Sequence, residues 1–540
     1  MPGGLAQLIG TQGSQNNFLT SNPQITFFKS VYRKYTRFSL EHIREQADTS
    51  QLLKTDTRTT RIKVPRNGDL ISDMYLEFKL PSIYSGRYND TSSTYNFKWV
   101  ENISNVLFKS VSLYIGGSKI DTLYGEWLNI YSELTSSMDE KSLADKLNGN
   151  IKELYSPENA PGQHGVYPHI TSGNQHERYD SSGFNIEKIS NVTSESGTIP
   201  SIPGETYRVH LPFWFSKNSG LALPLVALQY QLVEIEVELA PIYDLYTVIE
   251  VDSTNTAFGK RVIPTPDNQV RCGIEQFVID SNIVNINGST RTLKKFNIDL
   301  QLESTFVFLD EDERKRFAVY EHEYLVTQHH QLRKETGIID SQLDMAIDGL
   351  NPIKYLVVAP KRADAKTRND HFNFTNWIYQ DISPSSFEYQ FREKFYDNTN
   401  NRIPFFTNGA SGSTTTDFTE SNIKNNILDK LTLKFFGTDR FKETSHHFFE
   451  YQQPLQHFKK DKKRGIYLYS FSVDPMSDQP TGACNFSSIV NADLNLKLNI
   501  ISSQEYTTSS NKVPIDISVY LVNYNVLKFV SGTAGLVYTN

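Results

Sequence analysis

Few residues in this sequence have types and spacings that could carry out chemistry. The run Gly116-Gly117-Ser118-Lys119 has the composition of a phosphate-binding loop, but it lacks the G-x-x-x-x-G-K-[ST] spacing and no helix follows it directly. The sequence also lacks the G-x-S-x-G, H-E-x-x-H and C-x-x-C motifs of hydrolases, metalloproteases and redox or zinc sites. We therefore expect no catalytic residues and no enzymatic activity.

Histidines are common metal ligands, and four of the 12 histidines form two adjacent pairs, His329-His330 and His446-His447. Neighbouring residues of a strand point to opposite faces, so neither pair makes a ready metal site. Cupin enzymes need a His-x-His with a later acid, and the sequence contains no His-x-His. We expect no bound metal and no cofactor.

The stretch Val233–Leu239 alternates strictly between apolar residues and the three glutamates Glu234, Glu236 and Glu238. A period of two with β-branched residues predicts a strand with one buried and one solvated face. The glutamates would lie roughly 7 Å apart along that face. They could bind a cation, but a solvated strand face accounts for them better. Pro241 ends the strand, which closes a β-rich unit near the middle of the chain.

Length and composition describe a folded protein with more than one domain. A chain of 540 residues is too long for a single core, and 38% hydrophobic with 21% charged residues is typical of globular proteins. The 33 Phe and 29 Tyr favour strands, since aromatic side chains are enriched there. A net charge of −7 argues against specific binding of nucleic acid, which needs a basic face.

The expected cellular compartment is reducing, because Cys272 and Cys484 are the only cysteines and make no disulfide framework. Residues 1–13 lack the basic start and apolar core of a signal peptide. No apolar run approaches the roughly 20 residues needed to cross a bilayer. These features predict a soluble protein made in the cytosol.

Strand patterns separated by turns recur along the whole chain. Residues 107–115 and 118–123 flank Gly116-Gly117 and predict a hairpin. Apolar residues at helical spacing follow in residues 123–134, and a second short helix is expected to end at Asn148-Gly149. Many short strands, few helices and long polar segments indicate a protein with more than one β-sandwich.

Two long polar segments, Ser156–Glu205 and Asn398–Asn422, are expected to be surface loops. The polar stretch Tyr243–Asn268 contains Pro264 and Pro266, and we place the domain boundary there. The only dense basic run is Lys459–Arg464. It predicts a solvated loop, with contact to an anionic partner as the alternative.

Several blocks of this sequence stand out, in the following order: FLTSNPQITFFKSVYRKYTRFSLE, GDLISDMYLEFKLP, VSLYIGGSKIDTLYGEWLNIYSEL, PFWFSKNSGLALPLVALQY, FLDEDERKRFA followed by HEYLVTQ, YSFSVDPMSDQPTGACNF and the closing NYNVLKFVSGTAGLVYTN. These blocks resemble the major capsid proteins of nucleocytoplasmic large DNA viruses. The resemblance spans both halves of the chain, with departures just after Asn485-Phe486-Ser487, where relatives often have Arg and Asp, and at Thr533, where Met is common.

The resemblance implies an all-β fold of two consecutive eight-stranded antiparallel jelly rolls with long surface loops and a few short helices. Residues 1–30 would form an N-terminal inner-face segment, residues 31–250 the first roll and residues 251–540 the second. The implied function is that of a major capsid protein, a homotrimeric pseudo-hexagonal capsomer in the icosahedral shell of a large DNA virus. Two alternatives remain open: a minor capsid or penton-related paralogue, and a carbohydrate-binding jelly-roll protein.

The implied partners are further copies of the chain, neighbouring capsomers and minor capsid proteins on the inner face, with an internal membrane nearby. The protein would belong to the virion and be made and assembled in the host cytoplasm. The resemblance places the N-terminal segment on the inner side, and its candidate anchoring residues are Leu5, Leu8, Ile9, Pro23, Ile25 and Phe28.

Residues alone predict two helical pieces in this N-terminal region. Leu5, Leu8 and Ile9 fit one or two helical turns that should dock on another surface. Ser21 or Asn22 could cap a second helix with Pro23 at its first position. Such a helix could also pack on its own domain, which is the alternative to an anchoring role.

Six N-x-[ST] sequons offer the only candidate modification sites. In a cytosolic protein such matches arise mostly by chance. Asn89 and Asn191, which fall in polar loop-like segments, are the two that viral glycosylation could use. The other four are Asn102, Asn287, Asn373 and Asn485.

Overall fold

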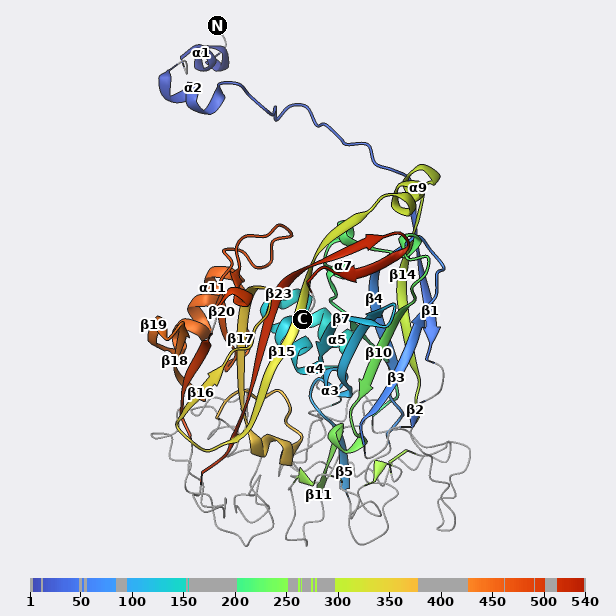
Figure 1. Ribbon diagram of the computed structural model, residues 1–540, viewed down its shortest axis with the longest axis vertical. Coiled ribbons are helices and arrows are strands. Elements are labelled where there is room, and N and C mark those ends of the chain that lie inside the picture. Colours follow the sequence, from blue (N-terminus) through green and yellow to red (C-terminus); the bar gives the residue numbers. More distant parts are fainter. Residues whose placement is uncertain are drawn as a thin grey trace, which may run out of the picture.

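The structure is a computed structural model in which two β-sandwiches stand side by side and an N-terminal segment projects away from them (Figure 1). The described residues are 3–10, 13–47, 51–52, 56–83, 95–151, 154, 202–250, 261–262, 264, 273–274, 277–278, 297–376, 426–460, 462–489, 491–500 and 512–538.

The first sandwich packs two antiparallel sheets against each other. One sheet has the order β1 (Phe38–Gln46), β14 (Leu300–Leu309), β4 (Leu70–Lys79) and β8 (Thr206–His210), and the short β9 (Leu223–Pro224) also pairs with β4. The other has the order β3 (Arg58–Val64), β10 (Val233–Leu239), β6 (Phe108–Ile115) and β7 (Ser118–Tyr124).

The second sandwich repeats this arrangement. One sheet has the order β15 (His322–Ile338), β23 (Ile515–Val530), β17 (Pro352–Arg362) and β20 (Tyr467–Ser470), with β21 (Cys484–Asn485) and β24 (Thr533–Leu536) added to β17 and β23. The other has the order β16 (Gln342–Ala346), β22 (Ala492–Leu498), β18 (Leu428–Phe435) and β19 (Thr438–Ser445).

Both sandwiches are eight-stranded jelly rolls with one topology. Numbered along the chain within each roll, the strands lie in the order first, eighth, third, sixth in one sheet and second, seventh, fourth, fifth in the other. This order is that of a jelly roll, in which hairpins wrap across two facing sheets. The predicted pair of consecutive eight-stranded antiparallel rolls is therefore confirmed.

The division between the rolls does not fall near residue 250, where we expected it. β14 pairs with β1 and β4 of the first roll, with Phe38 opposite Leu309 and Leu300 opposite Phe78. The last strand of a jelly roll must return to the first, so a long polar insertion before that strand resembles a linker in the sequence. The first roll thus extends to Leu309, and α9 (Glu311–Val319) leads into the second.

Corresponding strands of the two rolls begin and end at the same ends of the molecule. Leu309 and His322 flank α9 at the end of the molecule from which the N-terminal segment projects, and Leu300 and Ile338 lie at the opposite end (Figure 1). Residues 155–201 and 377–425 fall outside the described residues. Strand β8 follows the first of these segments, and its pairing with β4 shows that it begins at the end of the roll opposite the N-terminal segment. Strand β17 precedes the second, and its pairing with β23 shows that it ends at that same end.

Local patterns explain most of the regular elements. β10 alternates between buried apolar and partly exposed acidic residues, as predicted. The hairpin of β6 and β7 turns at Gly116 and Gly117, whose φ values of 58° and 82° are the left-handed conformation that glycine adopts at low cost. α4 (Gly125–Thr135) and α5 (Met138–Asn148) are the two expected helices, and α5 ends at Gly149 in the left-handed conformation.

Short elements complete the described structure. The remaining helices are α1 (Gly3–Gly10), α2 (Ser14–Thr20), α3 (Ile103–Leu107), α7 (Trp214–Lys217), η3 (Ser219–Leu221), η4 (Leu225–Ala227), η5 (Ile242–Asp244), η8 (Ala363–Arg368), η9 (Phe448–Gln452), α11 (Gln453–His457) and η10 (Phe486–Ser488). The remaining strands are β2 (Gln51–Leu52), β5 (Tyr95–Trp99), β11 (Tyr246–Glu250), β12 (Arg261–Val262) and β13 (Asn297–Ile298).

The helix predicted to start at Pro23 is wrong. Residues 23–37 form no helix, and Asn22 has a φ of 53° instead of the extended backbone of a helix cap. The expected apolar face of Ile25, Phe28 and Tyr32 has no neighbouring element to pack on in the described chain, since all three side chains are exposed. Short helices need such packing to be stable, so the capping signal was not sufficient.

Candidate functional site

The described residues contain no cluster of three or more His, Cys, Asp or Glu side chains that could hold a metal ion. His329 and His330 lie on a strand, as our argument about opposite faces assumed. His446 and His447 lie instead in a helical turn after β19, with ring centroids 4.1 Å apart. The strand argument was therefore wrong for this second pair.

The glutamates of β10 are paired with neighbouring strands. Glu236 accepts hydrogen bonds from Arg61 Nε at 2.6 Å and from the Tyr114 hydroxyl at 3.1 Å. Glu238 lies 3.2 Å from Lys109 Nζ and accepts a hydrogen bond from Ser110 Oγ at 2.9 Å. These cross-strand pairs fit the solvated-face interpretation of the alternation.

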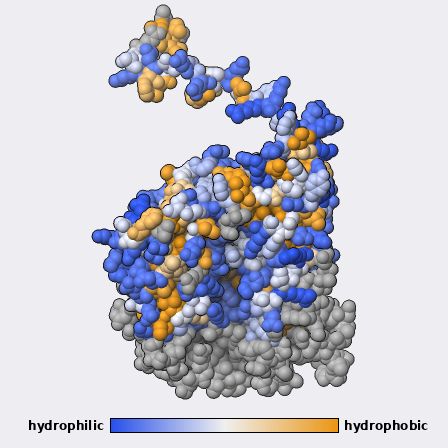
Figure 2. Space-filling model, viewed as in Figure 1, coloured by the Kyte–Doolittle hydropathy of each residue, from blue (hydrophilic) through white to orange (hydrophobic). Residues whose placement is uncertain are grey.

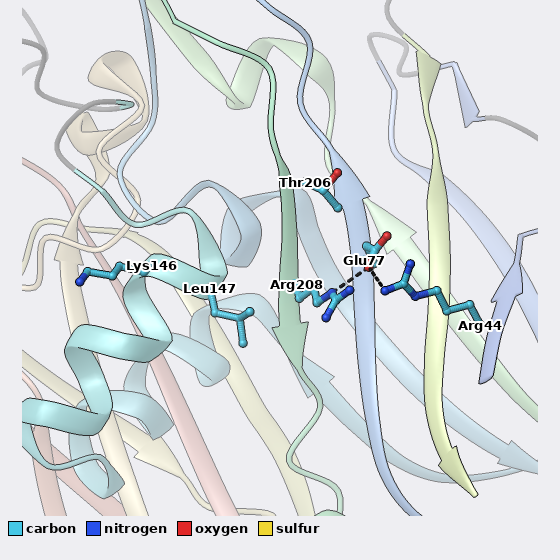
Figure 3. Close-up of a pocket in the computed structure, with 6 residues that line it drawn as sticks. All are labelled: Arg44, Glu77, Lys146, Leu147, Thr206 and Arg208. Carbon is cyan, nitrogen blue, oxygen red and sulfur yellow. Dashed lines mark hydrogen bonds and ion pairs between the residues drawn. The ribbon is translucent and has the colours of Figure 1, made fainter. Parts of the chain in front are cut away.

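One pocket is an open cavity of about 430 Å³ on the outer face of the β1–β8 sheet (Figure 3). Glu77 lies between Arg44 and Arg208, at 3.6 and 2.7 Å, and Glu303 pairs with the same two arginines. Both arginines therefore have carboxylate partners within the sheet. We assign the pocket no ligand, because these partners already neutralise the two arginines.

The N-terminal segment, residues 3–37, is the most exposed apolar part of the described chain. Figure 2 shows apolar side chains along it, well separated from the body of the molecule. Leu5, Leu8 and Ile9 lie in α1, as expected, and all three are exposed in the described chain. Phe27 and Phe28 are 89% and 98% exposed, which is unusual for side chains of this size.

The candidate anchoring residues do not meet at one site. Three lie in α1, and Pro23, Ile25 and Phe28 follow in extended chain beyond α2. The same stretch carries Lys29, Arg33, Lys34 and Arg37, and the first acidic residue of the sequence is Glu41. The segment is therefore cationic as well as apolar. No helix among the described residues is long and apolar enough to cross a membrane.

A second region, the junction between the two rolls, was not foreseen from the sequence. α4 of the first roll lies between the rolls, and Trp127 packs against Tyr355 of β17 and Tyr520 of β23, at 6.3 and 5.4 Å between ring centroids. All three side chains are buried. The main hydrophobic core is continuous across this junction, since one cluster includes residues of both rolls.

A buried polar cluster, the Asp121–His329–Lys217 triad, joins the rolls beside Trp127. The Asp121 carboxylate accepts the backbone N–H of His329 at 2.8 Å and lies 2.9 Å from His329 Nδ1. Lys217 Nζ lies 3.3 Å from His329 Nε2 and 4.7 Å from the centre of the Tyr131 ring. A neutral His329 that donates from Nδ1 and accepts at Nε2 satisfies all of these contacts.

The surroundings of the triad shift the pKa of each member. Burial, together with the Lys217 cation, lowers the pKa of His329. Burial alone would raise the pKa of Asp121, but the interactions with His329 outweigh it and the pKa is lowered. Lys217 is an exposed residue whose ammonium contacts His329 and the Tyr131 ring, and loss of hydration lowers the pKa of Lys217 to about 8.

A second polar contact joins the rolls near η5. The Asn369 side chain donates hydrogen bonds to the carbonyl oxygens of Tyr243 and Tyr246, at 2.7 and 2.9 Å. His371 Nε2 lies 2.9 Å from the Asp244 carbonyl oxygen. Loss of hydration and the nearby lysines Lys361 and Lys334 lower the pKa of His371 to about 4, so its ring is neutral at pH 7.

The basic run Lys459–Arg464 is also part of the junction. Lys463 Nζ lies 2.5 Å from Glu101, and the backbone N–H of Lys463 donates to Glu133 at 3.1 Å. Glu133 is only 2% exposed and also binds Lys141, at 2.6 Å. The expectation of a solvated loop is therefore wrong for Lys463, which binds acids of the other roll.

Signals for this junction are weak in the sequence. Asp121 and His329 lie in strands with many other polar residues, and the acids that bind Lys463 lie more than 300 positions away. A polar residue in a strand is more often solvated than buried, so such positions do not stand out without the fold.

The described sequons differ in exposure. Asn102 and Asn373 are 5% and 2% exposed, which makes them inaccessible in the folded chain, and Asn485 is exposed. Asn89 and Asn191, the two expected to be usable, lie outside the described residues.

Family comparisons divide the chain where the sheets do. A family model described as "Major capsid protein N-terminus" matches residues 26–278. Another, described as "Large eukaryotic DNA virus major capsid protein", matches residues 313–535. The unmatched interval contains β14 and the start of α9, which lie at the boundary between the rolls.

Similar curated proteins match over the whole chain. The major capsid protein of Phaeocystis pouchetii virus is 29% identical, and that of Paramecium bursaria Chlorella virus 1 is 28% identical, with all of both chains covered in each case. Among solved structures, a chain of the PBCV-1 virus capsid has a TM-score of 0.61 at 24% identity, covering 95% of this chain and 100% of that one. The Faustovirus major capsid protein has a TM-score of 0.58 at 14% identity, covering 94% and 93%.

Proposed function

Because this chain belongs to the family of large eukaryotic DNA virus major capsid proteins, we propose that three copies form a capsomer of pseudo-hexagonal outline. Its role in the virion is structural. Such capsomers would tile the icosahedral shell, contacting one another side by side. No step of this function requires catalysis, a metal or a cofactor.

The observation that carries this proposal is the repetition of one jelly roll within the chain. Both rolls have the same strand order and the same polarity of connections. Three such chains around a three-fold axis would place six similar sandwiches in a ring, which gives a hexagonal outline from a cyclic trimer. A permanent trimer of this kind should bury more than about 1,600 Å² at each interface.

The solution mass of the full chain tests the proposal. Three chains of 61.7 kDa give about 185 kDa, and light scattering should find a stable species of that mass with a hexagonal outline in negative stain. A monomer of 61.7 kDa at every concentration would contradict the trimer. In that event a glycan array should be examined, since a carbohydrate-binding protein would act as a monomer.

We further propose that residues 1–30 face the inside of the shell and contact minor capsid proteins or an internal membrane. The exposed aromatic residues and Lys29 of this segment, with Arg33, Lys34 and Arg37 just after it, support contact with a partner that is both apolar and acidic. The segment leads into β1 at Phe38, which pairs with Leu309, and it projects from the end of the rolls that carries α9 (Figure 1).

Deletion of residues 2–30 tests this second proposal. The variant should keep the trimer mass but lose co-sedimentation with phosphatidylserine vesicles, while a Phe27→Ser, Phe28→Ser double variant should bind them more weakly. Phosphatidylcholine vesicles control for purely apolar adsorption. If full-length protein sediments with neither vesicle, the membrane contact is excluded and recombinant minor capsid proteins become the partners to assay.

The long segments Ser156–Glu205 and Asn398–Asn422 are proposed to lie on the outer surface or between subunits. The described strands that flank them end opposite the N-terminal segment, which supports this placement. Deleting either segment should leave the rolls folded and change trimer yield or host contact, as measured by circular dichroism and scattering mass. Unfolding on deletion would disprove the placement.

Synthesis and assembly are proposed to take place in the host cytoplasm. The presence of only two cysteines supports a reducing compartment. Fractionation of infected cells during assembly, with an antibody against the chain, should find it in the cytosol and then in virions. Enrichment in the secretory pathway would contradict the proposal and would make the sequons at Asn89 and Asn191 candidates for modification.

A further inference from the structure

The junction between the rolls contains three histidines that the structural role does not use. His329, His330 and His371 all belong to the second roll and lie where it meets the first. His329 is 2% exposed, and the other two are partly buried. Two of them bind acceptors of the first roll directly, at Asp121 and at the Asp244 carbonyl.

We infer that the docking of the two rolls is weakened by acid, through proton uptake at His329 and His371. At His329 this effect follows from the contacts of the ring. A proton on Nε2 would remove the acceptor that now faces Lys217 Nζ at 3.3 Å and would place two cations in contact. The single carboxylate of Asp121 could not neutralise both, so protonation favours separation of β7 from β15.

Among the described residues, the His371 ring makes no hydrogen bond to a carboxylate that could stabilise a positive charge. Its Nε2 contacts a backbone carbonyl, and the charged groups that lower its pKa are lysines. A charged ring there would be poorly hydrated and would face Lys361 and Lys334. The contact is therefore made by the neutral ring, and protonation favours an open junction in which the ring reaches water.

Other charged groups around the junction do not cancel this effect. Lys119 of β7 and His330 of β15 add positive charge near Asp121, and Lys354 of β17 adds it near Lys217. Acids near His371 are already engaged, since Glu126 lies 3.4 Å from Lys361. The remaining titratable groups packed against the triad and His371 are Tyr131 of α4, Tyr355 of β17, Tyr520 and Tyr524 of β23 and the Asp244 carboxyl of η5.

The direction of the pH effect follows from the number of protons that the open and the closed junction bind. The pKa values of His329 and His371 lie below the value of about 6.5 that an exposed histidine has. The open junction therefore binds more protons than the closed one below about pH 6.5, and opening becomes more favourable as the pH falls. A histidine raises the opening constant by up to about tenfold per pH unit while the pH lies between its pKa in the closed junction and its pKa in the open one, and for His371 this range runs from about 4 to about 6.5.

Hydrogen–deuterium exchange on the full chain measures this opening constant, after correction for the pH dependence of intrinsic exchange. We expect peptides from β7, β15 and residues 363–374 to gain exchange between pH 7 and pH 5, by up to about tenfold per pH unit at the acidic end through His371 and more steeply where His329 also takes up a proton. Peptides from β3, β10, β18 and β22, which lie inside the sandwiches, should stay protected. Equal loss of protection in these strands would indicate global unfolding and overturn the proposal.

Single substitutions show which histidine takes up the protons that open the junction. His329→Asn keeps a donor towards Asp121, and His371→Gln keeps a donor towards the Asp244 carbonyl, while neither side chain titrates. Each should reduce the slope by up to about tenfold per pH unit. The control His42→Asn changes a histidine of β1 that contacts Thr305 within the first roll, and it should leave the slope unchanged.

The proposal does not depend on every variant folding. If His329→Asn fails to fold, His371→Gln and the wild-type slope decide the matter. A wild-type slope near zero between pH 7 and pH 5 overturns the inference, as does an unchanged slope in the histidine variants that fold.

Discussion

At the scale of single residues, α4 is intolerant of small changes where it packs on its own roll, because the backbones meet there without space. Gly125, the first residue of α4, shows this. A Cβ added there would lie 1.9 Å from the Asn105 carbonyl oxygen and 2.5 Å from that of Phe108. Both obstacles are backbone atoms, which cannot rotate away.

We predict that Gly125→Ala destabilises the protein by about 3 kcal/mol, because α3 or α4 must shift to admit the methyl group. The midpoint of denaturant unfolding measures the effect. Gly535→Ala is the matched control, since nothing lies within 4 Å of its added Cβ. Equal midpoints for the two variants would show that the contact at Gly125 is easily relieved.

Glu133, another residue of α4, does reach across the junction to the second roll. Its carboxylate is buried and accepts from Lys141 Nζ and from the backbone N–H of Lys463. Replacement by glutamine keeps the shape but removes the charge, and a hydrogen bond to a charged group contributes about 1.5–3 kcal/mol. We predict that Glu133→Gln lowers stability by an amount in this range.

The same denaturant assay measures the Glu133→Gln effect, and Glu443→Gln serves as its control. Glu443 also pairs with two lysines, Lys430 and Lys497, but it is half exposed. Exposed pairs contribute about 0–1 kcal/mol, so the control should lose little stability. A loss at Glu443 as large as that at Glu133 would contradict the importance of burial.

At the scale of elements, α5 is a helix that is stabilised mainly by the capping interactions at its ends. None of its residues is buried. Its start is a capping box in which Ser137 Oγ accepts the Glu140 N–H at 3.4 Å and Glu140 accepts the Ser137 N–H at 2.7 Å. A helix that lacks a buried face depends on such caps more than a buried helix does.

We predict that Ser137→Ala costs about 1 kcal/mol of local helix stability and leaves the rolls intact. Hydrogen exchange of peptides from residues 138–148 should rise by roughly fivefold, and exchange in α4 should not change. If α4 exchanges faster as well, α5 supports the junction and is not held by its ends alone.

Elements were predictable where their signal is local. The alternation in β10, the Gly116-Gly117 turn and the helical spacing of α4 are each complete within about a dozen residues, and each was confirmed. The helix at Pro23 was wrong for the opposite reason, because a cap alone does not determine a helix. Pairing of β14 with β1 joins residues more than 250 positions apart, and no local pattern reveals it.

The candidate site was less predictable than the fold. The N-terminal segment could be proposed from its apolar residues and from the family resemblance. The triad could not, because Asp121, Lys217 and His329 come from β7, α7 and β15 and meet only when both rolls are docked. The family resemblance supplied the architecture of two rolls, and it carried no information on which side chains join them.

At the scale of the whole molecule, the two rolls share one core. The main cluster of buried residues takes its members from both rolls. The members contributed by the second roll include Val326, Tyr355, Val357, Ala359, Phe372, Phe374, Phe458, Ile466, Leu468, Tyr520, Val522, Leu527 and Phe529. A fully buried large apolar side chain contributes about 1.5–3 kcal/mol, so exposing this set would be very costly.

We therefore predict that the second roll does not fold alone. A fragment of residues 311–540 should aggregate or remain unfolded when expressed by itself, because the face that meets α4 would be exposed. Co-expression with residues 1–310 should rescue it as a 1:1 complex, since the division after Leu309 cuts no strand. A division after residue 250 should fail to give that complex, because it separates β14 from β1 and β4. A soluble, monomeric fragment of residues 311–540 with a cooperative unfolding transition would show that each roll holds a sufficient core of its own.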